Sequence, residues 1–309
     1  MPILFTDLAE ASARLASTRS RLQKRRILVD LLARVPHDQL AAAVGWLIAE
    51  PLCGRLGVGP AHLWGLSATP AADRASVTLR EVEDALATSR GAGRDGAAVQ
   101  VAALFERLTG AERTLLAGAL TDSLRQGSLG GVMLLALGEL AGRDQSAVRR
   151  TVMLAGSIPR AAEALLGADR GLAPLAGMTL FRPLAPMLAA SSESLAAALA
   201  RVAEPLIEWK IDGVRAQVHK RGARVAVYSR QGNDITAGCD AVVRALATLA
   251  ADETVLDGEV VLVGPDGAPR PFQDSFSAIA SKSAPREGDR LRVYLFDCLY
   301  CDGVELLET

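Results

Sequence analysis

The spacing of the apolar residues changes near residue 204, and this change divides the chain into two regions of different fold class. Before it, Leu116, Leu120 and Leu124 in LTGAERTLLAGALTDSLRQG repeat at the spacing of one helical face. After it, VRAQVHK alternates apolar and polar residues, which is typical of a half-buried strand. We therefore predict an all-α N-terminal region followed by an α+β region with mainly antiparallel sheet.

The N-terminal region contains signals for where its helices begin and end. Thr109 and Glu112 have the spacing of a capping box, and we expect the helix that starts there to end at Gly127. Residues 128–131 are predicted to form a short loop before a helix in VMLLALGELAG. Further helices are predicted over residues 7–33, 38–50, 97–108, 144–155 and 160–166, with a short one within 191–203.

The strands are predicted in five segments of the C-terminal region. They are PLIEWK, VRAQVHK, ARVAVYSR, TVLDGEVVLV and LRVYLFDCLY, with a helix over residues 240–250 between strands. RPLAPMLA, Arg182 to Ala189, carries two prolines and resembles a boundary. We therefore predict a helical domain over residues 1–180, a linker over 181–203 and an α+β domain over 204–309.

Composition limits the class of protein without naming a partner. A chain of 309 residues that is 50% hydrophobic has enough apolar material for a globular core, and its net charge of -1 favours no partner. No signal peptide or membrane-spanning run is present, so we expect a cytoplasmic protein. Cys298 and Cys301 form a C-x-x-C without a second pair, which favours packing cysteines over a zinc site.

Lysine is rare in this chain, and one lysine stands in an unusual context. Lys210 lies in EWKIDGVR between a glutamate and an aspartate. Codon bias toward arginine explains the rarity, but lysine can lose its proton and act as a nucleophile, which arginine cannot do. Taken alone, this stretch is better explained as a solvated edge strand with one ion pair.

Other polar residues interrupt the apolar strands and change that balance. Arg230 ends one strand, Asp257 and Glu259 interrupt another, and Phe296 stands beside an aspartate in a third. Buried carboxylates are costly without partners, so these positions predict a polar site. Cations for phosphates, an acid for ribose or metal and a ring for the base together suit a nucleoside triphosphate. The P-loop pattern is absent, so the site is not of the Walker type.

These motifs resemble those of the covalent nucleotidyltransferases, which include DNA ligases, RNA ligases and mRNA-capping enzymes. K-x-D-G-x-R at Lys210–Arg215 is followed in order by YSR, LDGE and LFDCLYCDG. RPLAPMLA and LRQGSLGGVM resemble segments of ATP-dependent DNA ligases, of the bacterial actinobacterial type. The resemblance implies a helical DNA-binding domain followed by part of an ATP-grasp-like adenylation (nucleotidyltransferase) domain.

The resemblance also assigns roles to residues of the C-terminal region. Lys210 would attack the α-phosphate of ATP and carry AMP covalently. Arg215 and Arg230 would hold ribose and phosphate groups, and Glu208 would lie at the adenine. Glu259 would bind the ribose hydroxyls or Mg²⁺, and Phe296 would stack on the base. AMP would then pass to the 5′-phosphate of nicked double-stranded DNA, where the 3′-hydroxyl would displace it. The resemblance further implies a monomer that serves DNA replication, repair or recombination.

The helical region has its own candidate site in LRQGSLGGVM. Arg125, Gln126, Gly127, Gly130 and Gly131 lie at an expected helix start, where backbone amides can bind phosphate without reading bases. Spacing alone favours an ordinary glycine-rich connector, and the resemblance to DNA ligases reverses that preference. The basic run between Arg14 and Arg26 is interpreted as a solvated helix face.

Ligases of this family continue with an E-G segment, a K-x-K segment and a small β-barrel, none of which occurs here. We therefore expect a C-terminally truncated ligase that alone neither adenylates Lys210 efficiently nor seals nicks. Two alternatives stay open. An RNA ligase or other lysine nucleotidyltransferase would be distinguished by competition between nicked DNA and nicked RNA. A non-catalytic DNA-binding protein would bind nicks without response to ATP.

Overall fold

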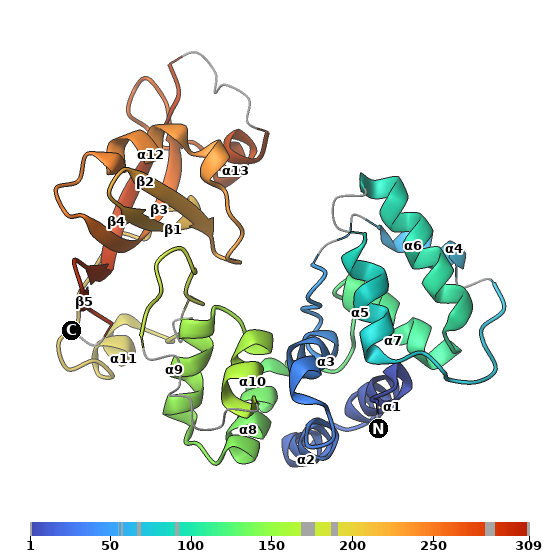
Figure 1. Cartoon of the computed structure of the whole chain (residues 1–309). Helices are drawn as coiled ribbons and strands as arrows, with labels where there is room; N and C mark the ends of the chain where they lie inside the picture. The colour runs from blue at the N-terminus through green and yellow to red at the C-terminus, as the bar shows by residue number, and fades with distance from the viewer. Residues whose placement is uncertain are drawn as a thin grey trace. The chain divides into compact units, whose positions relative to one another are not determined.

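The computed structural model describes residues 2–54, 56, 58–66, 69–89, 93–167, 177–186, 191–281 and 288–307. The chain forms two compact units, Met1–Leu175 and Ala176–Thr309, and each has its own hydrophobic core (Figure 1). The predicted linker over residues 181–203 falls within the second unit, and its residues 187–190 lie outside the described residues. No helix of the described chain is long and apolar enough to cross a membrane.

The first unit is helical, as predicted. Its helices are α1 (Phe5–Ala16), α2 (Arg21–Leu32), the 3₁₀ turn η1 (His37–Gln39), α3 (Leu40–Leu47), α4 (Pro60–Leu66), α5 (Leu79–Ala87), α6 (Gly93–Arg107), α7 (Gly110–Leu120), α8 (Gly130–Ala141), α9 (Gln145–Ala155) and α10 (Ile158–Leu166).

The capping box predicted at Thr109 is present and starts α7. The Glu112 carboxylate accepts a hydrogen bond from the Thr109 backbone N–H at 2.8 Å, and the Thr109 hydroxyl accepts one from the Glu112 N–H. The same reciprocal pair between Thr78 and Glu81 starts α5, a helix that the sequence analysis did not predict. Each box satisfies amide donors that a helix start leaves without partners.

Two predicted helices were too long. The segment 7–33 is broken between α1 and α2, because Ser20 adopts an extended conformation and its hydroxyl caps α2 by accepting from Gln23 N–H at 3.3 Å. The helix predicted to reach Gly127 ends at Leu120, and Asp122 follows with a left-handed φ of 52°. Leu124 therefore lies outside the helix and packs back against it at Gly118.

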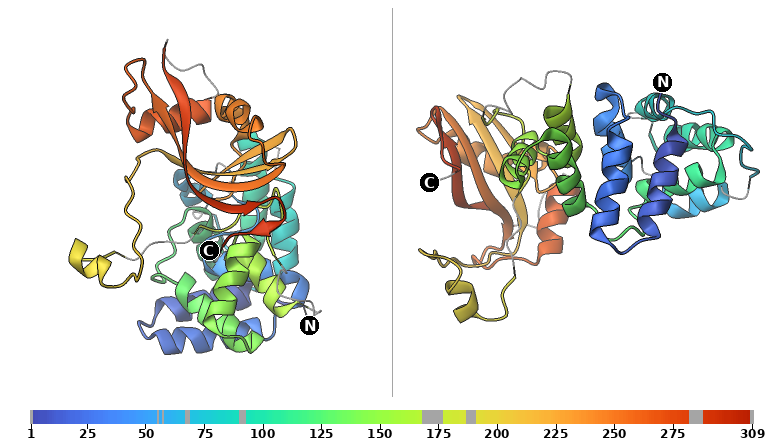
Figure 2. Two further views of the ribbon diagram at one scale, coloured as in Figure 1. Left: turned by 90° about the vertical axis from the view of Figure 1, so that its left-hand side faces the viewer. Right: turned by 90° about the horizontal axis from the view of Figure 1, so that it is seen from below.

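The second unit contains a five-stranded antiparallel sheet in the order β2-β1-β3-β4-β5. Its elements are α11 (Leu195–Leu199), β1 (Val214–Arg221), β2 (Arg224–Ser229), η2 (Thr236–Gly238), α12 (Asp240–Ala247), β3 (Glu253–Val263), α13 (Phe272–Ser281), β4 (Arg290–Cys301) and β5 (Val304–Glu305). The views in Figure 2 show the sheet strongly twisted, as antiparallel sheets normally are.

Helices α12 and α13 cover one face of this sheet. Ala216 and Val218 of β1 pack there with Val227 of β2, against Val242 of α12 and Ile279 of α13. The alternate residues of β1 point to the other face, because successive side chains of a strand project in opposite directions. The polar half of the alternation in VRAQVHK therefore lies on a face that these two helices leave uncovered.

Residues 177–186, called the strap below, lie across that second face. Leu184 N–H donates to Gln217 Oε1 at 2.7 Å, and Phe181 N–H donates to His219 Nδ1 at 3.0 Å. The Tyr228 hydroxyl donates to the Phe181 carbonyl at 3.1 Å. Phe181 has a left-handed φ of 65°, an uncommon conformation for a bulky residue, and these bonds hold it there.

The strand predicted in PLIEWK is absent, and this prediction was wrong. Residues 205–212 lie between α11 and β1 without a ladder to any described strand. Leu206, Ile207 and Trp209 are 83%, 75% and 94% exposed, so no described residue buries their side chains. The expectation that Glu208 and Lys210 share a strand face therefore lacks its structural basis.

Candidate active site and nucleic-acid interface

Arg215 is the centre of the polar cluster in the second unit. It lies near the start of β1, and its guanidinium donates hydrogen bonds to the Asp257 carboxylate of β3 from both Nε and Nη2. Asp257 is 6% exposed, and a carboxylate buried to that extent is costly without a partner. The two hydrogen bonds from Arg215 provide that partner. The hydrogen bond with Asp257 raises the pKa of Arg215 above its ordinary value, which keeps the guanidinium charged.

Glu259 lies directly opposite Arg215 in the ladder between β1 and β3. Its Oε1 accepts a hydrogen bond from Gly213 N–H at 3.1 Å. Burial raises the pKa of the Glu259 carboxyl, while that hydrogen bond and the charges of Lys210 and Arg215 act in the opposite direction. The Glu259 carboxyl is therefore held by the Gly213 amide, near the charges of Lys210 and Arg215.

Gly213, the glycine of the K-x-D-G motif, is required by its closeness to β3. A β-carbon at this position would lie 2.5 Å from the Val260 carbonyl oxygen and 3.0 Å from Glu259 Cγ. The absence of a side chain lets the chain enter β1 close enough for its amide to reach Glu259. The motif thus fixes the position of the segment that carries Lys210 just upstream.

Phe296 joins the cluster through a β-bulge. Asp257 pairs with Asp297 and Gly258 pairs with Leu295, so Phe296 is the additional residue of β4. Bulges change the direction of a side chain, and here the ring lies 5.7 Å from the Arg215 guanidinium carbon and is 42% exposed. One face of an aromatic ring beside a fixed cation suits a planar base with phosphates attached.

The structure brings some of the predicted residues together and leaves others apart. Arg215, Glu259 and Phe296 form the cluster, and Lys210 is exposed but near enough for its charge to act on Glu259. Glu208 is exposed in the segment before β1, and Arg230 is exposed just after β2. Neither has a hydrogen bond or ion pair with any residue that the structure describes, so their roles in nucleotide binding stay predictions.

The sequence analysis counted Asp257 among the residues of a polar site but assigned it no role. The signal was present, because Asp257 and Glu259 both interrupt an apolar strand. What the sequence could not show is that Asp257 holds Arg215 while Glu259 accepts from Gly213 N–H. In the register between β1 and β3, Glu259 lies opposite Arg215 and Asp257 opposite Gln217, so Arg215 binds the carboxylate diagonal to it rather than its direct neighbour.

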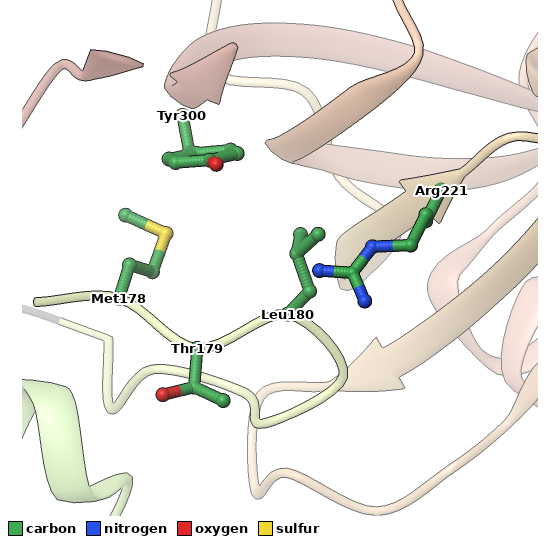
Figure 3. Close-up of a pocket in the computed structure, with 5 residues that line it drawn as sticks. All are labelled: Met178, Thr179, Leu180, Arg221 and Tyr300. Atoms are coloured by element: carbon green, nitrogen blue, oxygen red, sulfur yellow. The ribbon is translucent and has the colours of Figure 1, made fainter. Parts of the chain in front are cut away.

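A separate pocket lies at the far end of the strap. It is lined by Met178, Thr179, Leu180, Arg221 and Tyr300, and the side chains of Met178, Leu180 and Tyr300 point toward one another (Figure 3). Its volume of about 170 Å³ is below the roughly 300 Å³ at which ligand sites begin. None of the predicted site residues lines it. We therefore take the Arg215 cluster as the candidate site.

The cluster fits a magnesium ion that is held mainly by other ligands. The described residues contain no group of three metal-ligating side chains. Mg²⁺ keeps several waters and often takes only one or two carboxylates together with substrate phosphates. Glu259 can supply one such carboxylate, because only one of its oxygens accepts a described hydrogen bond.

The glycine-rich segment of the first unit forms a loop between α7 and α8. Arg125 is exposed, Gly127 is left-handed with a φ of 69°, and α8 begins at Gly130 rather than after Gly131. The amides of Gly130 and Gly131 have no acceptor among the described residues. Gln126 differs from the expectation, because its side chain is 4% exposed and its amide donates to Ser12 of α1. Gln126 therefore anchors the loop to α1 from the buried side.

Comparisons with known proteins show what this chain is similar to. Residues 186–309 match the family model of the ATP dependent DNA ligase domain. A probable DNA ligase of Anaeromyxobacter sp. (strain Fw109-5) is 39% identical over 98% of this chain. A probable DNA ligase of Rhodococcus opacus (strain B4) is 37% identical over 99% of it. Residues 186–309 are thus similar to an ATP-dependent DNA ligase domain, and nearly the whole chain is similar to probable DNA ligases. It spans 60% and 61% of the length of these two relatives.

Among solved structures, the ligase domain from M. tuberculosis LigD is 37% identical to the part of this chain that aligns with it. That comparison covers 33% of this chain and 31% of the other chain, with a TM-score of 0.27.

Proposed function

We propose that this chain binds ATP at the Arg215 cluster and forms a covalent AMP adduct on Lys210 for the sealing of nicks in duplex DNA. The observation that carries the proposal is the Arg215–Asp257 pair, with the Phe296 ring 5.7 Å from the guanidinium carbon and Glu259 opposite Arg215 in the ladder. The exposed Lys210 lies near enough for its charge to act on Glu259. The match of residues 186–309 to the ATP dependent DNA ligase domain supports ATP as the nucleotide.

In the first step, the neutral Lys210 amine attacks the α-phosphorus of ATP. A nitrogen–phosphorus bond forms, the bond to the bridging oxygen breaks, pyrophosphate leaves, and the amine loses a proton to solvent. Arg215, fixed by Asp257, holds phosphate or ribose oxygens, and Phe296 stacks on the base. Glu259 would hold Mg²⁺ or the ribose hydroxyls, and a bound Mg²⁺ would neutralise charge on the phosphates.

In the later steps, AMP moves from Lys210 to the 5′-phosphate of a nick, which restores the amine. The 3′-hydroxyl then attacks that phosphate, AMP leaves, and the phosphodiester closes. Phosphoryl transfer depends chiefly on positioning and charge stabilisation, and a rigid arginine fork provides both.

The test maps AMP on the chain after incubation with ATP labelled at the α-phosphate. We expect an adduct on the peptide that contains Lys210, and none on Lys24, Lys220 or Lys282, which serve as internal controls in the same digest. Lys210→Arg should abolish the adduct, because arginine keeps the charge but cannot become a neutral nucleophile.

Equilibrium binding of ATP is measured in parallel, because we expect adenylation of the chain alone to be slow. Arg215→Ala should weaken ATP binding, since it removes the fixed cation. An adduct on a different residue, or no ATP binding that depends on Arg215, would overturn the proposal.

A further inference from the structure

The basic start of helix α2 lies against the glycine-rich loop of the first unit. Lys24 Nζ donates a hydrogen bond to the Gln126 carbonyl, although the two residues are 102 positions apart. The same amine lies 3.4 Å from the position that a β-carbon would take at Gly127. The Arg21 guanidinium lies 3.9 Å from the corresponding position at Gly131. No local sequence pattern indicates this contact, which shows that Lys24 does not belong to a wholly solvated helix face.

Helix α2 is fixed in that position by its own packing. Arg25 forms an ion pair with Glu139 of α8, at 3.0 Å between Nε and Oε2. Ile27 and Leu28 of α2 are buried in the same core as Val132 and Met133 of α8. The basic side chains therefore meet the loop as part of one rigid arrangement.

The two basic residues occupy different environments. Lys24 is half-buried, and its ammonium is bonded to a loop carbonyl. Arg21 is exposed and forms no ion pair with any described residue, which leaves its charge available to an anion. Arg125, also exposed, is similarly unpaired within the described chain. Gly131 and Gly127 have no side chains, so a phosphate can approach the loop closely between these cations.

We infer that α2 forms the second half of the DNA-binding surface proposed for this loop. Arg21 contacts a backbone phosphate of the duplex beside Gly131. Lys24 is a positioning residue, which holds the loop in its binding conformation through the Gln126 carbonyl. This inference rests on the proposed sealing of nicks in duplex DNA and on the expectation from the sequence that the loop binds that duplex.

The inference is consistent with the geometry of α2. At about 100° per residue, Arg21, Lys24 and Arg25 lie within one arc of the helix surface, and Arg26 lies outside it. Arg26 is exposed and carries the same charge on the same helix, so it provides a matched control.

The experiment measures binding of the 309-residue chain to a fluorescent duplex with one 5′-phosphorylated nick, by anisotropy over roughly 50–200 mM salt. Arg21→Ala should weaken binding severalfold and lower the slope of log affinity against log salt by about 0.9, the value for one lost phosphate contact. Arg26→Ala should leave both the affinity and the slope unchanged.

Lys24→Met should weaken binding with little change in slope, because it loosens the loop without removing a phosphate contact. Hydrogen exchange of the amides of residues 127–131 in the free chain should then be faster in Lys24→Met and unchanged in Arg21→Ala. A slope change in Lys24→Met equal to that in Arg21→Ala would overturn the positioning role.

Two loop variants distinguish failure of this inference from failure of the proposed function. Arg125→Ala and Gly131→Asp should both weaken binding. If they do and Arg21→Ala has no effect, α2 is not part of the surface, while the loop remains. If neither loop variant has an effect, the proposed DNA surface is wrong and the inference falls with it.

Discussion

At the scale of single residues, Asp257 decides how the candidate nucleotide site is held. It is nearly buried and binds Arg215 through two hydrogen bonds, so its charge is used inside the protein rather than offered to a ligand. A long side chain such as arginine loses considerable conformational freedom on binding a ligand. Because Asp257 fixes Arg215 before any ligand arrives, that loss is smaller at the binding step.

We therefore predict that Asp257→Asn weakens ATP binding although it removes no group that touches ATP. The change also leaves Arg215 with a weaker acceptor, and we expect it to lower the free energy of unfolding by about 2 kcal/mol. Calorimetric titration with ATP and urea unfolding would measure the two effects.

Asp289→Asn is the control for this prediction. Asp289 is similarly covered and accepts a hydrogen bond from Arg270 at 3.0 Å, away from the cluster. It should destabilise the second unit to a comparable degree and leave ATP affinity unchanged. Equal losses of ATP affinity in both variants would show that Asp257 acts only through stability.

At the scale of elements, the strap depends on the protonation state of one buried histidine. His219 is fully buried, and its Nδ1 accepts from Phe181 N–H while its Nε2 faces Gln217 Oε1 at 2.9 Å. This arrangement requires the neutral imidazole with its proton on Nε2, because a second proton on Nδ1 would point at another donor. Burial lowers the pKa of His219 from its ordinary 6.5 to about 4.

This pKa makes the stability of the second unit depend on pH in a defined direction. Because the folded value is below the unfolded one, the unfolded chain binds more protons between them, and stability rises with pH in that interval. The contribution is fully present above pH 6.5 and is lost as the pH falls toward 4. The loss amounts to about 3 kcal/mol, at 1.36 kcal/mol for each pKa unit.

Urea unfolding at a series of pH values would check this prediction. His219→Gln keeps an amide that can accept from Phe181 and cannot titrate, so its stability should vary less over the same interval. If the wild-type chain and the variant lose stability in parallel as the pH falls, other groups are responsible.

At the scale of the whole molecule, the sequence predicted the two fold classes and most elements, and it failed where partners are distant. Alternation identified β1 to β4, because the period of a strand is visible locally. The same alternation in PLIEWK was misleading, since a strand also needs a neighbour and none is described. The bond from Lys24 to Gln126 and the bond from Phe181 to His219 join residues 102 and 38 positions apart, which no local pattern reveals.

The two units have separate hydrophobic cores. The core of the first unit draws its residues from Ile3 to Leu166, and that of the second from Ala216 to Ile279, with no residue in common. Cooperative unfolding follows a shared core, so we expect calorimetry to show two transitions. Leu28→Ala should lower the free energy of unfolding of the first unit only, and Leu246→Ala that of the second unit only. Each loss should be roughly 2–5 kcal/mol, because both leucines are buried. A single transition that both variants shift would mean that the units unfold together. The proposed Lys210 and α2 sites would then depend on the same free energy of unfolding. A destabilising change in either unit would therefore weaken both ATP and DNA binding.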